Sequence, residues 1–137
     1  MNSPTVQQTN DGDPMTRNRA SAKAAGAAAE RAVADYLAEH LDDDRIDRRV
    51  KHGNKDRGDI GGLRVHGQRL VAEVKNCSRV DLAGWIAEAQ IECDNDDALA
   101  GIVIHKRKGT TDVGRWYVAM TVTELLALLT GQKAETP

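Results

Sequence analysis

An acid, an aliphatic residue and a lysine follow one another in a segment that is otherwise apolar. Glu73 and Lys75 belong to the run 70–75, and Asp59 lies upstream of them. Alternate residues of a strand point to the same face, so the carboxylate and the ammonium group of this run should lie side by side. Because Mg²⁺ prefers oxygen ligands, this grouping predicts a site for a hard divalent cation.

The chain between Asp59 and this run is short enough for a hairpin. Segments 59–65 and 69–75 both have strand character, and glycines mark the bends between them. Pairing of the two segments would bring Asp59 to the end of the second strand, beside Glu73. Two carboxylates and a backbone carbonyl are a typical protein share of a Mg²⁺ site.

Such a site could hydrolyse a phosphodiester. The cation could polarise the phosphate and help to deprotonate a water, while Lys75 orients that water or offsets charge in the transition state. Glu73 and Lys75 could instead form a solvated cross-strand ion pair, because an acid and a lysine two residues apart often occur by chance. The apolar strand around them, the upstream Asp59 and a basic loop before it favour the site.

Basic residues gather just before Asp59, although the formal net charge of the chain is −2. A second basic run begins at Lys106. DNA affinity rests largely on phosphate contacts, so these runs predict a DNA-contacting surface, with a solvated loop as the alternative. The predicted contact residues of the first run are Arg48, Arg49, Lys51, Lys55 and Arg57.

Periodicity predicts an α/β domain. Alanines at helical spacing indicate a helix from about residue 18 to the acidic residues 42–44, and further helices begin at Asp81 and at Thr121 or Thr123. The predicted strands are 46–50, 59–65, 69–75, 101–105 and 116–120. This order favours a mixed central sheet with helices on its faces.

Asp59 followed by Glu73-Val74-Lys75 resembles the PD-(D/E)xK nuclease motif, with Gly58 in place of the proline. The resemblance implies a restriction-endonuclease-like fold with an αβββαβ core. It also implies Mg²⁺ as the cofactor, with Mn²⁺ able to substitute, and the Val74 carbonyl as a metal ligand.

The upstream pattern Lys23-x-x-Gly26-x-x-x-Glu30 resembles the opening helix of archaeal-type Holliday junction resolvases in the same superfamily. The resemblance implies that Glu30 is a further metal ligand, that Lys23 contacts DNA and that Gln90 is a polar active-site residue. It also implies a homodimer acting on branched or four-way-junction DNA. Taken alone, Glu30 could be a helix charge paired with a nearby base, and Gln90 an ordinary helix residue.

The segment 45–55 contains no serine to match the one that such resolvases place near their first strand. A restriction- or exonuclease-like DNase and an inactive DNA-binding module of the same fold are therefore alternatives. The four histidines and two cysteines lack zinc-ligand spacing. An aromatic content of 3% argues against base-stacking platforms.

Residues 1–16 are polar and predict a disordered tail, followed by one domain at 17–131 and a short tail at 132–137. No run approaches the ~18 apolar residues needed to span a bilayer. The N-terminal residues have no apolar core of a signal peptide. We therefore expect a cytoplasmic protein without a membrane partner.

Overall fold

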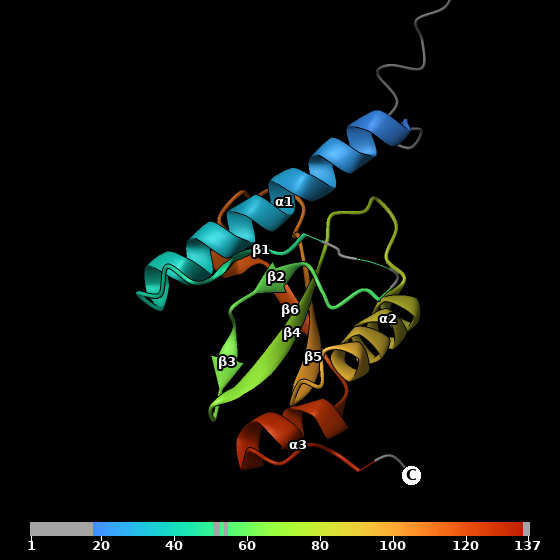
Figure 1. Cartoon of the computed structure of the whole chain (residues 1–137). Helices are drawn as coiled ribbons and strands as arrows, with labels where there is room; N and C mark the ends of the chain where they lie inside the picture. The colour runs from blue at the N-terminus through green and yellow to red at the C-terminus, as the bar shows by residue number, and fades with distance from the viewer. Residues whose placement is uncertain (1–17, 51–52, 54, 136–137) are drawn as a thin grey trace, which may run out of the picture.

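The computed structural model describes residues 18–50, 53 and 55–135 (Figure 1). The helices are α1 (Arg19–His40), α2 (Leu82–Asn95) and α3 (Val122–Thr130), with a 3₁₀ turn, η3, at Val113–Arg115. The strands are β1 (Asp47–Arg48), β2 (Ile60–Gly61), β3 (Arg64–Val65), β4 (Gln68–Lys75), β5 (Ala100–His105) and β6 (Tyr117–Ala119). The predicted α/β class and the order of the elements are confirmed.

The strands form one mixed sheet in the order β1-β2-β4-β5-β6, with β3 paired to β4 beside this path. Only the central pair β4–β5 is parallel, and it places Glu73 opposite Val103 and Lys75 opposite His105. The predicted hairpin is confirmed, because Ile60 pairs with Ala72 and Val65 with Gln68, both antiparallel.

The first arm of that hairpin is two short strands rather than one. Gly62, with a φ of +88°, separates β2 from β3. A Cβ at this position would collide with the Arg45 carbonyl, so only glycine fits the bend. The predicted strands at 46–50 and 116–120 are also shorter in the structure, at Asp47–Arg48 and Tyr117–Ala119.

Polar side chains begin the helices where the sequence predicts. Asp81 accepts a hydrogen bond from the backbone N–H of Gly84 at 3.1 Å, and Thr121 accepts one from that of Glu124 at 3.1 Å. These bonds satisfy amide groups that have no partner inside the helix. Gly131 ends α3 in the left-handed conformation, with a φ of 75°.

Helices cover both faces of the sheet (Figure 1). Val33 of α1 packs in one core cluster with Ala72 and Val74 of β4. On the other face, Trp85 and Ala89 of α2 pack against β5. The side chains of Glu73 and Val71 point to this second face, because alternate residues of a strand lie on the same side.

Helix α3 packs near the beginning of β5, where Ala127 contacts Leu99 and Ala100. Helix α3 therefore does not cover the opposite end of the sheet, where β4 and β5 finish. The predicted disordered tail at 1–16 lies outside the described residues. Among the described helices, none is both long and apolar enough to cross a membrane.

Candidate active site

A pocket of about 420 Å³ lies at the end of β4. It is lined by the four predicted side chains and the predicted carbonyl residue, which are Glu30, Asp59, Glu73, Val74 and Lys75. Small residues of α1, Ala22 and Gly26, line another part of it. The structure therefore brings together three acids and a lysine from α1, the hairpin and β4.

Asp59 is held rigidly against β4. Its carboxylate accepts a hydrogen bond from the Val74 N–H at 2.7 Å, and its own N–H donates to the Ala72 carbonyl at 3.0 Å. Burial, and then the charge of Glu73, raise the pKa of Asp59 to about 7, although the Val74 N–H opposes this shift. A carboxylate in apolar surroundings is unfavourable, and a bound cation would stabilise its charged form.

Glu73 is buried, with 6% of its surface exposed. One oxygen, Oε1, lies 3.4 Å from Lys75 Nζ, while the buried Oε2 receives no hydrogen bond from a donor group among the described residues. Burial, and then the neighbouring Glu92, raise the pKa of Glu73 to about 9. Burial of a carboxyl oxygen that receives no hydrogen bond lowers the stability of the fold. Such groups are typical of ligand-binding and catalytic sites.

Lys75 lies between two carboxylates. Its Nζ is 2.9 Å from Glu88 on α2 and 3.4 Å from Glu73. Burial alone would lower the pKa of Lys75, but these two acidic groups outweigh it and the pKa is raised. The lysine is therefore a cation at neutral pH, poised beside the acids.

Glu30 reaches the pocket from α1 and is also paired with a base. Its Oε1 accepts hydrogen bonds from Arg48 Nε at 3.2 Å and from an Arg48 terminal nitrogen at 3.0 Å. Glu30 thus lines the pocket and is also a helix charge paired with a base. Arg48 thereby lies close to the pocket rather than in a loop remote from it.

Gln90 does not line this pocket. It lines a separate one with Thr121 and Glu124. Positions two residues apart on a helix point in nearly opposite directions, so the α2 face that meets Glu73 carries Glu88 and Glu92 instead. The structure therefore does not bring Gln90 together with the other predicted site residues.

Sequence reasoning missed two buried or half-buried acids beside Glu73. Glu92 of α2 and Asp56 of the loop before β2 each place a carboxylate oxygen near it, and all three oxygens lie within 4.8 Å of one another. Glu92 carried a signal, because it interrupts the apolar stripe that includes Ala89 and Cys93. Asp56 carried none beyond being an acid in a basic loop.

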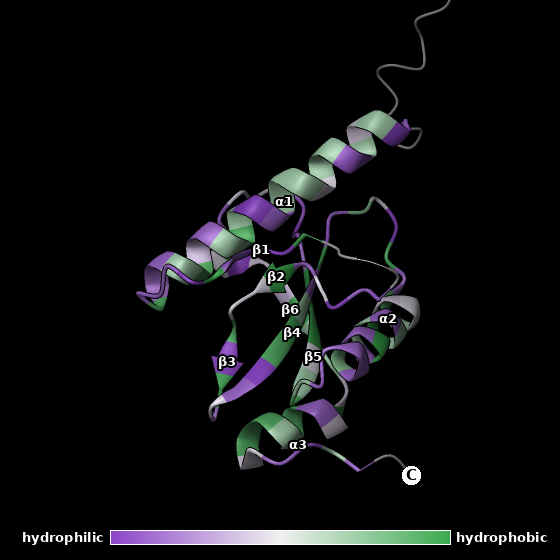
Figure 2. Cartoon of the chain, viewed as in Figure 1, coloured by the Kyte–Doolittle hydropathy of each residue, from purple (hydrophilic) through white to green (hydrophobic). Residues whose placement is uncertain are grey.

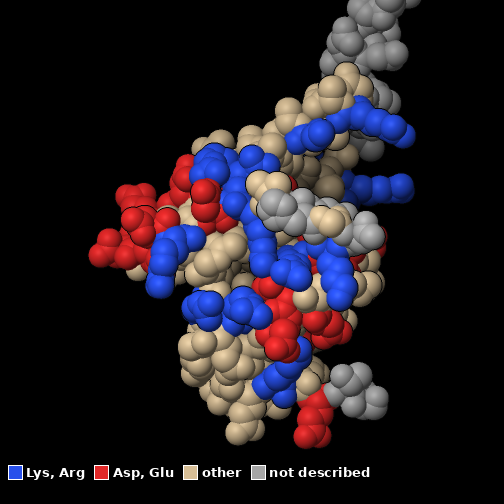
Figure 3. Space-filling view, in the orientation of Figure 1, with Lys and Arg blue, Asp and Glu red and all other residues tan. Residues whose placement is uncertain are grey.

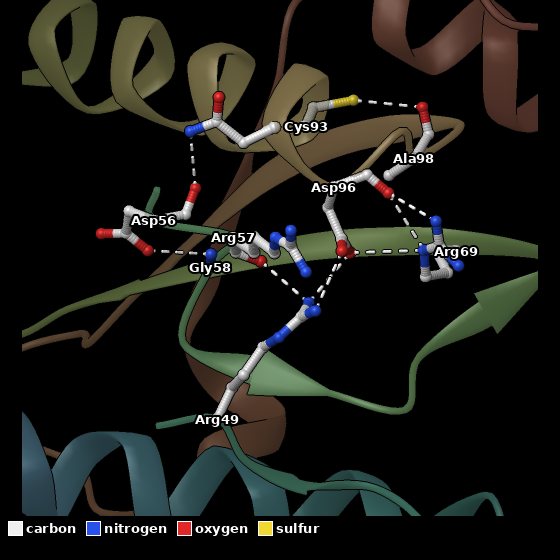
Figure 4. Close-up of polar contacts among 9 residues, drawn as sticks. Arg49, Asp56, Arg57, Gly58, Arg69, Cys93, Asp96 and Ala98 are labelled. Atoms are coloured by element: carbon white, nitrogen blue, oxygen red, sulfur yellow. Dashed lines mark hydrogen bonds and ion pairs between the residues drawn. The ribbon is translucent and has the colours of Figure 1, made fainter. Parts of the chain in front are cut away.

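The basic run before Asp59 is divided between different roles. Arg49 is committed to the fold (Figure 4), with two nitrogens each 2.9 Å from the carboxylate of Asp96 and one 3.1 Å from the Arg57 carbonyl. Asp96 is buried and also receives Arg69, which donates to its backbone carbonyl at 2.8 Å. Arg49 therefore has a structural role in the described fold, while its predicted phosphate contact stays a prediction.

The other predicted DNA contacts remain accessible in part. Lys23, Lys55 and Arg57 are exposed, and Lys51 lies outside the described residues. Lys106 is half-buried, and its Nζ lies 6.0 Å from the centre of the Trp116 ring. Its backbone N–H donates to the Lys75 carbonyl at 2.9 Å. Figure 3 shows Lys and Arg side chains in a band between α1 and α2, beside acidic side chains at the end of α1.

Replacing Arg49 with Gln is expected to lower the free energy of unfolding by about 2 kcal/mol, because the buried Asp96 loses its bidentate partner. Urea unfolding followed by circular dichroism measures the change. Arg57→Gln is the matched control, since Arg57 is exposed and contributes only its backbone carbonyl to this network. Equal stability of the two variants would show that the Arg49–Asp96 pair does not stabilise the fold.

Fold and site together define a mixed α/β protein with a carboxylate–lysine pocket at the end of its central strands. Comparisons of the chain with protein-family models, with curated proteins and with solved structures found no match.

Proposed function

We propose that this protein is a metal-dependent DNA endonuclease with a restriction-endonuclease-like fold of the PD-(D/E)xK class. The observation that carries the proposal is the convergence of Glu30, Asp59, Glu73 and Lys75 on one pocket. An apolar pair at this strand end would stabilise the fold better than a buried glutamate beside a lysine does. Their presence is best explained by chemistry.

The donor set of the pocket suits Mg²⁺ or Mn²⁺. It offers carboxylate oxygens and the Val74 carbonyl, and the buried Oε2 of Glu73 receives no hydrogen bond from a donor group in the part of the chain that the structure describes. A bound divalent ion would supply Lewis acidity toward a phosphate oxygen and toward a water. Asp59, fixed by the Val74 N–H, would orient its free oxygen for this ion.

The remaining residues would position the substrate. Lys75, kept cationic by Glu73 and Glu88, can hold an attacking water or offset negative charge on the phosphate. Arg48, which now pairs with Glu30, can turn to a phosphate when Glu30 turns to a metal ion. Both changes would break the same Arg48–Glu30 ion pair, so binding of DNA and of metal should favour each other.

A cleavage assay tests the proposal. Four-way junction, flap, duplex and single-stranded DNA are compared, each with Mg²⁺ and with EDTA. Cleavage that requires the metal supports the proposed function, and preference for the four-way junction supports a resolvase-like enzyme. Absence of cleavage on all four substrates with both Mg²⁺ and Mn²⁺ would favour an inactive DNA-binding module.

Replacing Lys55 and Arg57 with Gln is expected to weaken DNA binding for all sequences. Both side chains are exposed in the loop that precedes Asp59, and each lost phosphate contact should reduce the slope of log affinity against log salt by about 1. Fluorescence anisotropy over a salt series measures the slope. Arg45→Gln is the control, because Arg45 pairs with Asp43 at 2.9 Å beyond the end of α1; an unchanged slope in the double variant would place the loop away from DNA.

We also propose that the chain forms a homodimer through α3 and β6. Val122 and Leu129 of α3 are 81% and 72% exposed, and Val118 of β6 is 54% exposed. Figure 2 shows α3 as largely hydrophobic. Two chains related by a two-fold axis would present two equivalent pockets, as paired cuts in a four-way junction require.

Light scattering at micromolar concentration is expected to give twice the chain mass of 14.9 kDa. Leu129→Glu should shift the protein toward the monomer, because it places a charge in the apolar contact. Thr130→Glu, at the neighbouring exposed position, is the control. A mass of one chain at every concentration, with and without junction DNA, would contradict the dimer.

A further inference from the structure

A second group of acids lies behind the pocket. Asp56, Glu73 and Glu92 come from the loop before β2, from β4 and from α2, and each offers a carboxylate oxygen within 4.8 Å of the other two. Two of them were not part of the predicted active site. Three elements distant in sequence thus place acidic groups at one point inside the domain.

Two oxygens of this group receive no hydrogen bond from a donor group among the described residues, and the two carboxyl groups that carry them can bond to each other through a shared proton. The two oxygens are Oε2 of Glu73 and Oε1 of Glu92. These two residues are 6% and 4% exposed. The nearest bases are used elsewhere, since Lys75 lies closer to Glu88 than to Glu73. Buried carboxylates without donors are costly unless a cation or a proton joins them.

The loop that carries Asp56 is tied down on both sides (Figure 4). One carboxylate oxygen, Oδ1, accepts a hydrogen bond from the Gly58 N–H at 3.0 Å, and the backbone carbonyl accepts one from Asn95 of α2 at 2.8 Å. Gly58 has a φ of +97°, and a Cβ there would lie 2.9 Å from a Val71 methyl group. The backbone therefore holds Asp56 beside α2, with its second oxygen available.

We propose that Asp56, Glu73 and Glu92 form a divalent-cation site of their own, which shares Glu73 with the pocket at the end of β4. An ion bound to oxygens at 2.0–2.6 Å can join oxygens up to about 4–5 Å apart, which matches this group. The all-oxygen donor set selects Mg²⁺, Mn²⁺ or Ca²⁺ rather than a soft metal.

The neighbouring thiol does not change this selection. Cys93 follows Glu92 on α2, but its Sγ donates to the Ala98 carbonyl at 3.3 Å. Burial raises the pKa of this thiol to about 11, so it stays protonated and is a poor metal ligand at neutral pH. The site therefore takes a hard cation.

A proton shared between Glu73 and Glu92 is the rival explanation of their closeness. It would satisfy both side chains without any ion and would give Asp56 no role. The two explanations differ in what Glu92→Gln does, because an amide can replace the shared proton but is a much weaker ligand for a divalent ion.

Binding of Mn²⁺ to the full chain, followed by electron paramagnetic resonance of the free ion, tests the proposal. Glu92→Gln and Asp56→Asn are each expected to weaken at least one Mn²⁺ binding step by at least about tenfold. Asp94→Asn is the matched control, since it removes one acid from the same helix at a position 79% exposed. Thermal unfolding without metal checks that each variant is folded.

The measurement has no cleavage readout, so it is independent of the proposed nuclease function. Mn²⁺ binding that is weakened by both variants, and unchanged by Asp94→Asn, supports the site. Unchanged binding in Asp56→Asn and Glu92→Gln would overturn it and leave the shared proton. If Glu92→Gln does not fold, Asp56→Asn alone decides, because its side chain lies on a half-exposed loop.

Discussion

Glu73→Gln is expected to reduce Mg²⁺-dependent DNA cleavage by at least about 1,000-fold. Glu73 belongs to both acidic groups, so the neutral amide removes a ligand from each. Lys75→Ala should cause a loss of similar size, because among the described residues no other lysine lines the pocket. Single-turnover cleavage of a labelled four-way junction measures both effects.

Controls separate loss of chemistry from loss of structure. Glu39→Gln removes an exposed acid near the end of α1 and should leave cleavage unchanged. DNA binding in Ca²⁺ should persist in Glu73→Gln, since the proposed phosphate-contacting residues Lys55 and Arg57 do not line the pocket. Cleavage by purified Glu73→Gln at the wild-type rate would remove the pocket as the active site.

The hairpin that builds the pocket could be predicted because its signals are local. Alternation in 69–75 sets the face of Glu73, and the glycines between the arms set the bend. Asp59 then follows from antiparallel pairing alone. Caps such as Asp81 and Thr121 are local in the same sense, and all of these were confirmed.

The remainder depends on contacts between residues far apart in the chain. Arg49 resembles its basic neighbours in sequence, yet it forms an ion pair with Asp96, which lies 47 residues further along the chain. Glu92 meets Glu73 only because the parallel pairing of β4 and β5 places α2 on that face. Neither partnership leaves a periodic pattern, so spacing could not reveal it.

The acids concentrated around Glu73 explain why the site should weaken the fold that carries it. Glu92 lies beside it, and Asp59 is near enough for the charge of Glu73 to raise its pKa. Lys75 is the cation that contacts Glu73 directly. Proteins commonly retain such unfavourable groupings where function requires them, and a ligand of opposite charge then restores stability.

The metal-free protein is therefore expected to lose stability as the pH rises from 6 to 9, and Glu73→Gln should remove most of that loss. Burial and Glu92 raise the pKa of Glu73 from 4.5 to about 9 in the folded chain. Below pH 4.5 the carboxyl group is protonated in both states. Between the two pKa values the folded chain holds a proton that the unfolded chain releases, so the stability contribution is lost progressively until the pH passes 9.

The expected loss in the wild type is about 3.5 kcal/mol between pH 6 and pH 9, as measured by urea unfolding in EDTA. Asp94→Asn, an exposed change of the same charge, should retain the wild-type pH dependence. Added Mg²⁺ should raise wild-type stability most at high pH, where the ionised carboxylates bind it best, and should stabilise Glu73→Gln much less. If Glu73→Gln lost stability with pH as steeply as the wild type, the titrating group would be another residue and Glu73 would already be ionised in the folded protein.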